Sequence, residues 1–567
     1  MNQSVIPIKV QGASRQRKRE APKGRRVDPQ ALLEVQTLLG KASRQRDLLI
    51  EHLHAIQGHY GCLSTAHLAA LAQEMRLAQA EVYEVATFYH HFDVLREGQA
   101  APPALTVRVC DGLSCELAGA RDLLDKLPAV LGAEVRVLAA PCVGRCEQAP
   151  VAVVGQNAIG HASVAAVAAA SAARDTAPVV HSHVDYDDYR AAGGYRLVRD
   201  CAAGLVDAET IIATMEASSL RGLGGAGFPT GRKWRIVRAE PAPRLMAINL
   251  DEGEPGTFKD RHYLERDPHR FLEGALIAAW VVNVETIFIY LRDEYHGCRL
   301  MLEAELEKLR ADPPAPGMPK IVLRRGAGAY ICGEESAMIE SIEGRRGMPR
   351  LRPPYVAQVG LFNLPTLAHN FETLHWVRDI LEKGADWFGG HGVNGRCGLR
   401  SFSVSGRVRA PGVKLAPAGI TVAALIADYC GGMPDGHQFY AYLPGGASGG
   451  ILPAAMSDIP LDFDTLQPYG CFIGSAAIVV LSTRDSAAAA ARNMLKFFQH
   501  ESCGQCTPCR VGTAKAVRLL DEAQWDTVLL GELSQVMRDA SICGLGQAAP
   551  NPFDCVIKYF PHEIVQP

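Results

Sequence analysis

Two groups of cysteines lie near opposite ends of this chain. The first group is Cys110, Cys115, Cys142 and Cys146, and the second begins with Cys503, Cys506 and Cys509. Thiolates are soft ligands, and closely spaced thiolates bind transition metals and iron–sulfur clusters. The chain therefore has the residues to hold two one-electron carriers, provided that its fold brings each group together.

The spacing in the first group is C-x4-C, a gap of 26 residues, and C-x3-C. Zinc sites usually use C-x2-C hooks, because a two-residue gap folds both sulfurs onto one tetrahedral ion. The wider hooks favour two irons bridged by sulfide, each bound by two thiolates. The spacing predicts a [2Fe–2S] cluster, and a zinc ion or unligated core cysteines are the alternatives.

The second group has the spacing C-x2-C-x2-C. Three thiolates on such a tight turn suit one face of a [4Fe–4S] cubane, whose fourth ligand must then come from elsewhere in the chain. Cys543 and Cys555 are the candidates for that ligand. A zinc ion is the alternative to the cluster.

A glycine-rich loop at residues 221–234 contains the pattern G-x-G-x-x-G. Gly222, Gly224 and Gly225 would let backbone amides approach a phosphate or a flavin ring, and Lys233 adds a positive charge. The loop follows a helical stretch, whereas the dinucleotide-binding fingerprint follows a strand. The pattern alone therefore leaves a plain turn open.

Two further loops combine acids with glycine. Residues 249–256 follow a predicted strand at 245–249, and residues 326–335 follow another at 321–324. Open α/β sheets bind ligands at the carboxyl ends of their strands, which is where these carboxylates would lie. Solvated acids in surface turns are the alternative for either loop taken alone.

The composition is that of an ordinary globular protein with several domains. The 567 residues are 48% apolar and 21% charged, and the net charge of −3 gives no reason to expect nucleic acid. The most apolar stretch, residues 274–291, is interrupted by Asn283, Glu285 and Thr286 and does not predict a membrane span. We expect a cytoplasmic protein with reduced thiols and no membrane insertion.

Hydrophobic periodicity divides the chain into segments. Residues 1–27, with eight Lys or Arg, predict a disordered basic arm, which is either a solvated tail or a contact with an acidic partner, with a mitochondrial transit peptide as a third option. The other predicted segments are a helical bundle (28–98), an α/β unit with strands at 105–109 and 134–138 (99–173), a linker (174–198), an α/β domain with a mostly parallel sheet (199–390), a small β-rich domain (391–484) and a helical domain (485–567).

The segment Glu84–Tyr89 (EVATFY), followed by the first cysteine group, resembles the small iron–sulfur subunit of respiratory complex I. The resemblance covers about residues 28–170. It implies a thioredoxin-like fold for the [2Fe–2S] domain.

The glycine loop, the two acidic loops and the second cysteine group, in this order, resemble the flavin-bearing, NADH-oxidising subunit of complex I. The resemblance runs from about residue 219 onward and implies a Rossmann-like FMN and NAD domain, a ubiquitin-like β-rich domain and Cys543 as the fourth ligand of the [4Fe–4S] cluster. It implies that Phe228, Glu254 and Glu335 contact NAD(H), with both glutamates positioning the nicotinamide. It further implies a set of FMN-binding residues: Gly222, Gly224, Gly225, Lys233, Asn249, Asp251, Gly333, Glu334 and Asn370.

Together these features predict a diaphorase, in which a flavin takes hydride from NADH and returns electrons one at a time to iron–sulfur clusters. The fusion of both modules most resembles the β subunit of an NAD-dependent formate dehydrogenase, with an iron–sulfur and molybdopterin (tungsten or molybdenum) α subunit as partner. The diaphorase subunit of an NAD-linked hydrogenase is the second possibility, although fused versions there often lack the first cysteine group, and a fused input module of complex I is the third. A metal-binding scaffold or redox sensor is the non-enzymatic alternative.

Overall fold

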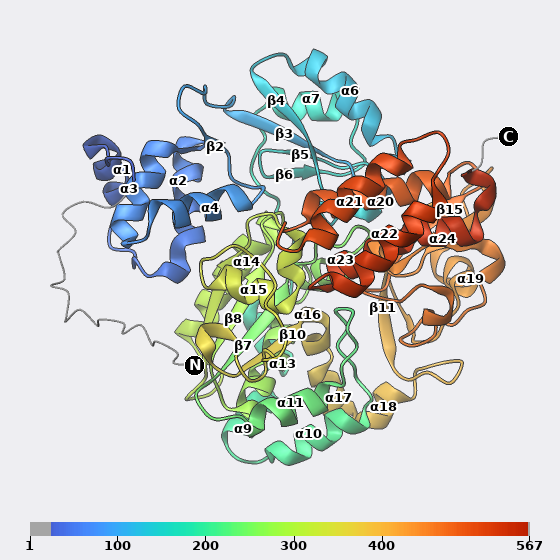
Figure 1. Cartoon of the computed structure of the whole chain (residues 1–567). Coiled ribbons are helices and arrows are strands. Elements are labelled where there is room, and N and C mark those ends of the chain that lie inside the picture. The colour runs from blue at the N-terminus through green and yellow to red at the C-terminus, as the bar shows by residue number, and fades with distance from the viewer. Residues whose placement is uncertain (1–23, 565–567) are drawn as a thin grey trace, which may run out of the picture.

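The computed structural model describes residues 24–564, so the predicted basic arm lies almost entirely outside the described residues. The first two thirds of the chain form a helical bundle and two four-stranded sheets, and the last third forms a five-stranded sheet and a group of helices (Figure 1). A short two-stranded sheet, β1 (Leu63–Ser64) and β2 (Val94–Leu95), accompanies the bundle. Among residues 24–564, none of the helices combines the length and apolar character that crossing a membrane requires.

The N-terminal bundle has four main helices: α1 (Pro29–Leu39), α2 (Leu49–Tyr60), α3 (Thr65–Met75) and α4 (Gln79–Phe88). The Asp28 carboxylate caps α1 by accepting from the amides of Gln30 and Ala31, and Gly61 ends α2 in the left-handed conformation (φ 75°). The buried apolar residues of these helices join a core that continues to the parallel sheet and the C-terminal helices.

The first cysteine group lies in a four-stranded sheet of order β4-β3-β5-β6. Its strands are β3 (Leu105–Cys110), β4 (Val135–Ala140), β5 (Ala152–Val154) and β6 (Asn157–Ile159), and its helices are α5 (Leu113–Leu117), α6 (Ala120–Leu131) and α7 (Val164–Ala172). Strands β3 and β4 are parallel, whereas β5 is antiparallel to β3 and β6 to β5. Gly119, in the left-handed conformation (φ 94°), separates α5 from α6.

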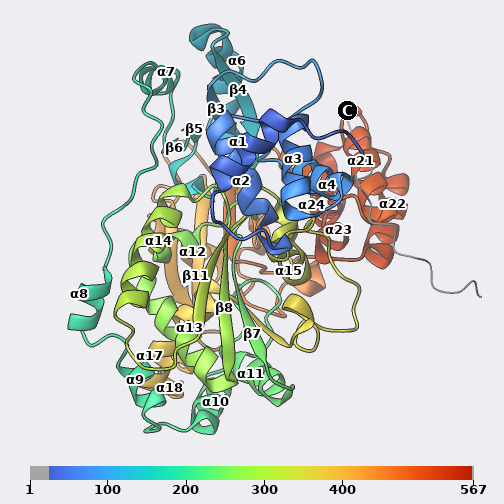
Figure 2. The same cartoon turned by 90° about the vertical axis from the view of Figure 1, so that its left-hand side faces the viewer.

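The central sheet has the order β10-β7-β8-β9 and is parallel throughout. Its strands are β7 (Arg244–Leu250), β8 (Val284–Leu291), β9 (Lys320–Arg325) and β10 (Thr366–Asn370). The buried helix α13 (Pro268–Val282) and α14 (His296–Ala311) connect β7 to β8 and β8 to β9. The carboxyl ends of all four strands therefore lie at one edge of the sheet. Figure 2 shows the helical bundle and the first sheet above the central sheet. The helices α9 (Arg196–Ala202), α10 (Ala208–Ala217) and α11 (Thr230–Ala239) lie toward the opposite end.

A five-stranded mixed sheet of order β12-β11-β15-β13-β14 follows. It is formed by β11 (Leu399–Gly406), β12 (Gly412–Pro417), β13 (Phe439–Leu443), β14 (Leu452–Pro453) and β15 (Ala477–Ser482). The C-terminal helices are α20 (Ala487–Glu501), α21 (Thr507–Leu520), α22 (Thr527–Ala540), α23 (Gly544–Ala548) and α24 (Asn551–Tyr559). The strands expected at 105–109, 134–138, 245–249 and 321–324 are present, and their ends differ by one or two residues.

The segment interpreted as a linker, residues 174–198, is more structured than its polar composition predicts. It contains α8 (Tyr186–Ala191), whose Tyr186 and Tyr189 are buried. The Tyr189 hydroxyl donates to Glu273 at 2.6 Å, and the Tyr186 amide donates to Glu305 at 2.9 Å. The segment is therefore fastened along the outside of α13 and α14. The exact domain boundaries remain predictions.

Candidate cofactor and cluster sites

The first cysteine group converges at one end of its sheet. Cys110 ends β3, Cys115 lies in α5, and Cys142 and Cys146 lie in the loop after β4; all four thiols are buried. The sulfurs of Cys142 and Cys146 are 3.3 Å apart, and the Gly144 amide donates to Cys142 Sγ at 3.4 Å. Hydrogen bonds from the Cys110 and Cys146 thiols hold the pKa of Cys142 well below its usual range. Four buried cysteine sulfurs that meet at one end of a sheet suit a [2Fe–2S] cluster.

Two arginines fasten the loop of Cys142 to the parallel-sheet region. Arg292, just after β8, donates to the Cys142 carbonyl at 2.7 Å and to the Glu252 carbonyl. Arg261 donates to the Gly144 carbonyl at 2.9 Å. The acidic loop after β7 and the first cysteine group therefore share Arg292 as a common support.

The second cysteine group lies between the C-terminal helices. Cys503 precedes α21, Cys506 caps it, Cys509 lies in its first turn, and Cys543 caps α23. Helix α23 packs closely on α21, because a Cβ added at Gly546 would meet Cys509 Cβ at 2.8 Å. Burial raises the pKa of the Cys509 thiol to about 12, and the neighbouring thiols of Cys506, Cys543 and Cys503 add to the rise. The cluster of four thiols suits a cubane.

The competing ligand, Cys555, has a different neighbour. Its sulfur lies 3.6 Å from that of Cys471, and both side chains are buried. The geometry therefore favours Cys543 over Cys555 as the fourth member of the second group.

The acidic loops meet at the carboxyl edge of the parallel sheet. Asn249 on β7 and Asn370 on β10 are register partners, and the Asn249 amide reaches the loop after β9 by donating to the Gly333 carbonyl at 2.8 Å. Asn370 donates to Asp260 at 2.7 Å and caps α16 (Phe371–His375). Residues from three strand ends thus surround one site.

The glycine loop closes this site from the side of β10. The Leu223 amide donates to the Thr373 hydroxyl at 3.0 Å, and a Cβ at Gly224 would lie 3.0 Å from Asn370 Cβ. Gly225 has φ 123°, which L residues rarely adopt, and faces the backbone of Gly474. Glycine is therefore required where the loop's backbone approaches the strand edge. Its N–H groups are suited to phosphate and ring oxygens.

Asp251 is the most informative buried acid at this edge. Its Oδ2 atom has no hydrogen-bond partner among the described residues, and burial raises its pKa well above the usual range. A buried, unpartnered carboxylate oxygen is costly. A hydroxyl-bearing ligand such as the ribityl chain of FMN would supply the missing donor, so this position fits the expected cofactor.

Glu334 and Glu335 differ in their surroundings. Glu334 caps α15 (Glu335–Ile342), accepting from the amides of Ser336 and Ala337 at 2.9 Å, and also pairs with Arg352. Glu335 lies 3.0 Å from the same Arg352 and is one-third exposed. Glu334 thus has a local structural role in addition to any ligand contact, whereas Glu335 faces the open side.

Glu254 is held by two residues that the sequence did not single out. Its Oε1 atom accepts from the amide and hydroxyl of Ser448 at 2.8 and 2.7 Å, and its Oε2 atom accepts from the Tyr330 hydroxyl. Burial raises the Glu254 pKa, and these hydrogen bonds oppose the rise. The only sequence signals were the glycines around Ser448 and the position of Tyr330 inside the second acidic loop.

Phe228 and Lys233 lie on either side of the start of α11. Phe228 is 38% exposed, and the Arg232 guanidinium lies over its ring at 5.8 Å from the ring centre. Lys233 is half-buried, and its ammonium group donates to the Ala368 carbonyl at 3.1 Å. Since an ammonium group carries three donors, further N–H groups remain for a phosphate.

Three family models match the chain. The thioredoxin-like [2Fe–2S] ferredoxin matches residues 35–173, the Nuo51 FMN-binding domain matches residues 215–379, and the NADH-ubiquinone oxidoreductase-F iron–sulfur binding region matches residues 489–567. The protein is therefore an iron–sulfur flavoprotein that binds FMN, one [2Fe–2S] cluster and one [4Fe–4S] cluster. The zinc alternatives for the two cysteine groups are not supported.

Similar proteins define the family. The F-type subunit (number 2) of the NADH-quinone oxidoreductase of Rhizobium meliloti (strain 1021) is 40% identical over 408 residues, which are 68% of this chain and 97% of that protein. The F-type subunit of the same oxidoreductase from Aquifex aeolicus (strain VF5) is 38% identical over 401 residues, which are 68% of this chain and 91% of that protein. The chain belongs to the family of F-type subunits of NADH-quinone oxidoreductase, with a thioredoxin-like [2Fe–2S] domain fused in front. The expected resemblance to the small iron–sulfur and flavin subunits of complex I is thus confirmed.

Solved structures of one enzyme match nearly the whole chain, including the fused domain. One of them is the NAD⁺-reducing [NiFe]-hydrogenase in the air-oxidized state, with a TM-score of 0.81 and 31% identity. The match covers 92% of this chain and 94% of that chain.

Proposed function

We propose that this chain is the diaphorase subunit of an NAD-linked, multisubunit oxidoreductase of the hydrogenase type. The observation that carries the proposal is the likeness along 92% of the chain to a chain of the NAD⁺-reducing [NiFe]-hydrogenase. This match includes the flavin domain and both cluster domains within one polypeptide. This choice reverses the ranking suggested by the sequence, since the comparisons favour the hydrogenase and complex I alternatives over formate dehydrogenase.

The carboxyl edge of the parallel sheet is the proposed site of hydride exchange. Bound FMN supplies the chemistry, accepting hydride from NADH and releasing electrons singly. We assign its contacts to the glycine loop, Lys233, Asn249, Asp251, Gly333, Glu334 and Asn370. Glu254, fixed by Tyr330 and Ser448, and Glu335, on the open side, are assigned to the nicotinamide, and Phe228 to the adenine.

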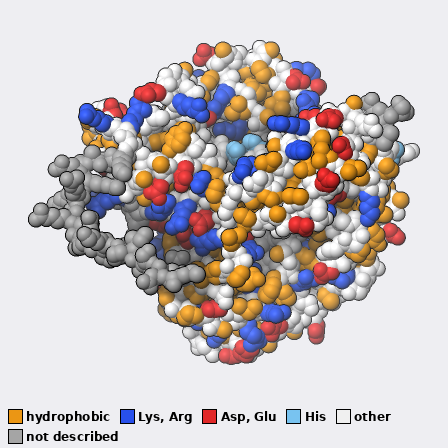
Figure 3. All heavy atoms as spheres, viewed as in Figure 1, with side chains coloured by type: hydrophobic (Ala, Val, Ile, Leu, Met, Phe, Trp, Pro, Cys, Tyr) orange, Lys and Arg blue, Asp and Glu red, His pale blue; other side chains and the backbone are white. Residues whose placement is uncertain are grey.

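The protein between the three sites supports electron transfer among them. Arg292 connects the acidic loop at Glu252 to the loop of Cys142. A cavity of about 770 Å³ is lined by Cys142 on one side and by residues of α20 on the other, including His500, which is three residues before Cys503. Figure 3 shows histidine and basic side chains around a hollow on this face of the molecule. Cys142 of the first group and α20, the helix that precedes Cys503, thus border one cavity.

Formate dehydrogenase remains the second candidate partner. The observation that supports it is the complete first cysteine group. All four of its members, Cys110, Cys115, Cys142 and Cys146, lie together. Metal analysis of the native complex separates the two assignments: nickel supports the hydrogenase partner, and tungsten or molybdenum supports the formate partner. A native complex with neither metal, and a quinone-reducing activity, would instead place the chain in complex I.

Reduction of the purified holoprotein by NADH tests the diaphorase activity itself. We expect bleaching of the visible flavin absorbance, followed by the electron paramagnetic resonance signals of reduced clusters. Flavin that is bound but stays oxidised with excess NADH would contradict the proposal and support a scaffold or sensor. The experiment is independent of the partner's identity.

A further inference from the structure

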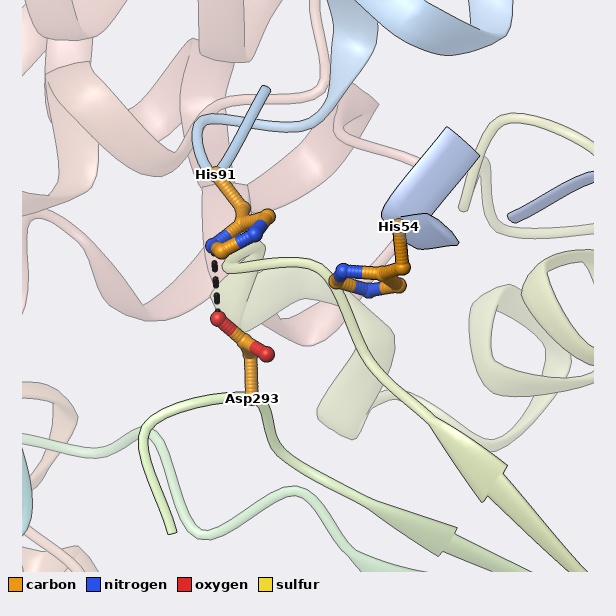
Figure 4. A group of neighbouring side chains, drawn as sticks. All are labelled: His54, His91 and Asp293. Carbon is orange, nitrogen blue, oxygen red and sulfur yellow. Dashed lines mark ion pairs between the residues drawn. The ribbon is translucent and has the colours of Figure 1, made fainter. Parts of the chain in front are cut away.

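A group of three potential metal ligands that contains no cysteine lies where the helical bundle meets the parallel sheet. His54 belongs to α2, His91 follows α4, and Asp293 follows β8 (Figure 4). One ligand atom from each lies within 4.8 Å of the other two. None of the cofactor assignments above uses these residues.

The tautomer of His54 follows from its hydrogen bond. His54 Nε2 lies 2.8 Å from the Gly326 carbonyl oxygen, and because a carbonyl only accepts, Nε2 carries the proton. The opposite nitrogen, Nδ1, is then a lone pair. It is buried in a side chain that is 6% exposed, and it has no hydrogen-bond partner among the described residues.

This arrangement is the one that metal-binding histidines adopt. A ligating imidazole usually donates its second N–H to a backbone carbonyl or a carboxylate, which fixes the ring and aims the lone pair. The Gly326 carbonyl is that acceptor for His54. A buried lone pair without a donor costs free energy in the absence of a ligand, so its retention needs an explanation.

Asp293 is also held in a fixed orientation by its hydrogen bonds. Its Oδ1 atom accepts from Arg325 at 2.6 Å, and its Oδ2 atom lies 2.6 Å from His91 Nδ1. Both carboxylate oxygens are therefore held in a fixed orientation by neighbouring side chains.

His91 is held by its backbone while its side chain is half-buried. Its amide donates to the Ala327 carbonyl at 3.1 Å, and its carbonyl accepts from the Gln57 side chain at 2.7 Å. His54 and Arg325 also line a cavity of about 1020 Å³, which provides an entry path. The half-buried His91 can therefore adjust its position more easily than the buried His54 and Asp293.

We propose that His54 Nδ1, His91 Nδ1 and Asp293 Oδ2 form a Zn²⁺ site that ties the helical bundle to the flavin domain. Two imidazoles and one carboxylate, with an open fourth position for water, are a common zinc donor set. Bonds of about 2.0–2.2 Å would draw these donors to roughly 3.5 Å from one another, a small closure led by His91. The ion takes the place of the proton now held between His91 and Asp293, and that proton passes to His91 Nε2 or to solvent.

Arg325 distinguishes a zinc site from a plain network of ion pairs. Its guanidinium orients Asp293 but also repels a second cation. Zinc affinity therefore depends on both the gain from the oriented carboxylate and the loss from charge repulsion. We expect the substitution Arg325→Gln to bind zinc several-fold more tightly, because a neutral amide still donates to Oδ1. In a plain ion-pair network, the same substitution would create no metal affinity.

The test uses holoprotein with FMN and both clusters in place, so that the cluster cysteines are occupied. After incubation with ZnCl₂ and gel filtration, we expect one additional zinc per chain, with an X-ray absorption spectrum that shows only nitrogen and oxygen donors. His54→Gln and Asp293→Asn should each weaken zinc binding by about 10- to 100-fold.

His375→Gln is the matched control. His375 is also buried with an unpartnered Nδ1, but it belongs to no such group of ligands among the described residues. It should leave zinc binding unchanged. The proposal is overturned if the holoprotein takes up no stoichiometric zinc, if the spectrum contains sulfur donors at about 2.3 Å, or if His54→Gln and His375→Gln bind zinc equally.

Discussion

Asn249 and Asn370 end two neighbouring parallel strands as register partners, and each side-chain amide reaches a different loop. Asn249 donates to the Gly333 carbonyl at 2.8 Å, and Asn370 donates to Asp260 at 2.7 Å. The pair therefore joins the ends of β7 and β10 to the loops that enclose the proposed FMN site. Substitutions at this pair test the site without touching a cysteine.

Asn249→Asp should weaken FMN retention. The change removes the donor to the Gly333 carbonyl and faces that oxygen with a negative charge, at a cost of about 1–3 kcal/mol, or roughly tenfold or more in FMN affinity. Asn394→Asp is the matched control, because Asn394 donates to the Gly419 carbonyl at 2.9 Å in the β-rich region. Flavin content after dialysis measures both. Equal flavin loss in the two variants would contradict the assignment.

Gly224→Ala should also reduce flavin binding. A Cβ at this position would lie 3.0 Å from Asn370 Cβ, so the loop must move away from the strand edge. Gly58→Ala, where a Cβ in helix α2 meets nothing within 4 Å, should leave flavin binding unchanged and stabilise the helix slightly. FMN titration of the apoflavoprotein reports the difference. An unaltered affinity in Gly224→Ala would place FMN elsewhere.

Cys543→Ser and Cys555→Ser separate the two candidates for the fourth cubane ligand. Cys543 caps α23 beside Cys509, whereas Cys555 lies 3.6 Å from Cys471. Cys543→Ser should lose or strongly perturb the [4Fe–4S] signal and up to about four irons per chain. Cys555→Ser should keep both. Iron analysis and low-temperature electron paramagnetic resonance of the NADH-reduced variants decide between them, and the reverse pattern would assign the ligand to Cys555.

Tyr330→Phe should raise the KM for NADH more than it lowers kcat. The Tyr330 hydroxyl donates to the buried carboxylate of Glu254, so its removal loosens that side chain and raises its pKa further. The KM effect should therefore grow as the pH falls, since more Glu254 becomes protonated. Tyr442→Phe is the control, because Tyr442 donates to the Met456 carbonyl instead. Identical pH profiles for the two variants would remove Glu254 from NADH binding.

The parts of the fold that could be predicted are those encoded by local patterns. Strands such as 321–324 are short apolar runs followed by glycine, and the cysteine spacings directly restrict the clusters they can bind. Helix α8 was missed because residues 174–198 are polar, and the contacts that fasten Tyr186 and Tyr189 come from residues 119 and 84 positions away.

Contacts between distant residues also limit what the sequence predicts about the site. Glu254 could be named from its loop, but its partners Tyr330 and Ser448 lie 76 and 194 residues away. The approach of His54 to Asp293 likewise depends on how the bundle packs on the sheet. Long-range packing leaves no periodic signal in the sequence, so such partners become visible only in three dimensions.

Acid should destabilise the protein partly through His375. Burial, together with the nearby Arg270 and His262 and against the opposing effect of Asp379, lowers its pKa to about 3. Because the folded pKa lies below the unfolded value of about 6.5, the neutral ring contributes stability that is present above pH 6.5 and is lost as the pH falls toward 3. Between pH 7.5 and 5.5 the loss from this group is about 1.4 kcal/mol.

His375→Gln removes that titration while keeping a neutral side chain of similar size. The thermal unfolding midpoint of the variant should therefore fall less between pH 7.5 and 5.5 than that of the unsubstituted protein, a range in which both can be compared with clusters and flavin bound. His391→Gln, at a more exposed position after α18 (Ala385–Gly389), should keep the original slope. If His375→Gln also keeps it, the ring is protonated in the folded state and its surroundings must include an acceptor that compensates for burial.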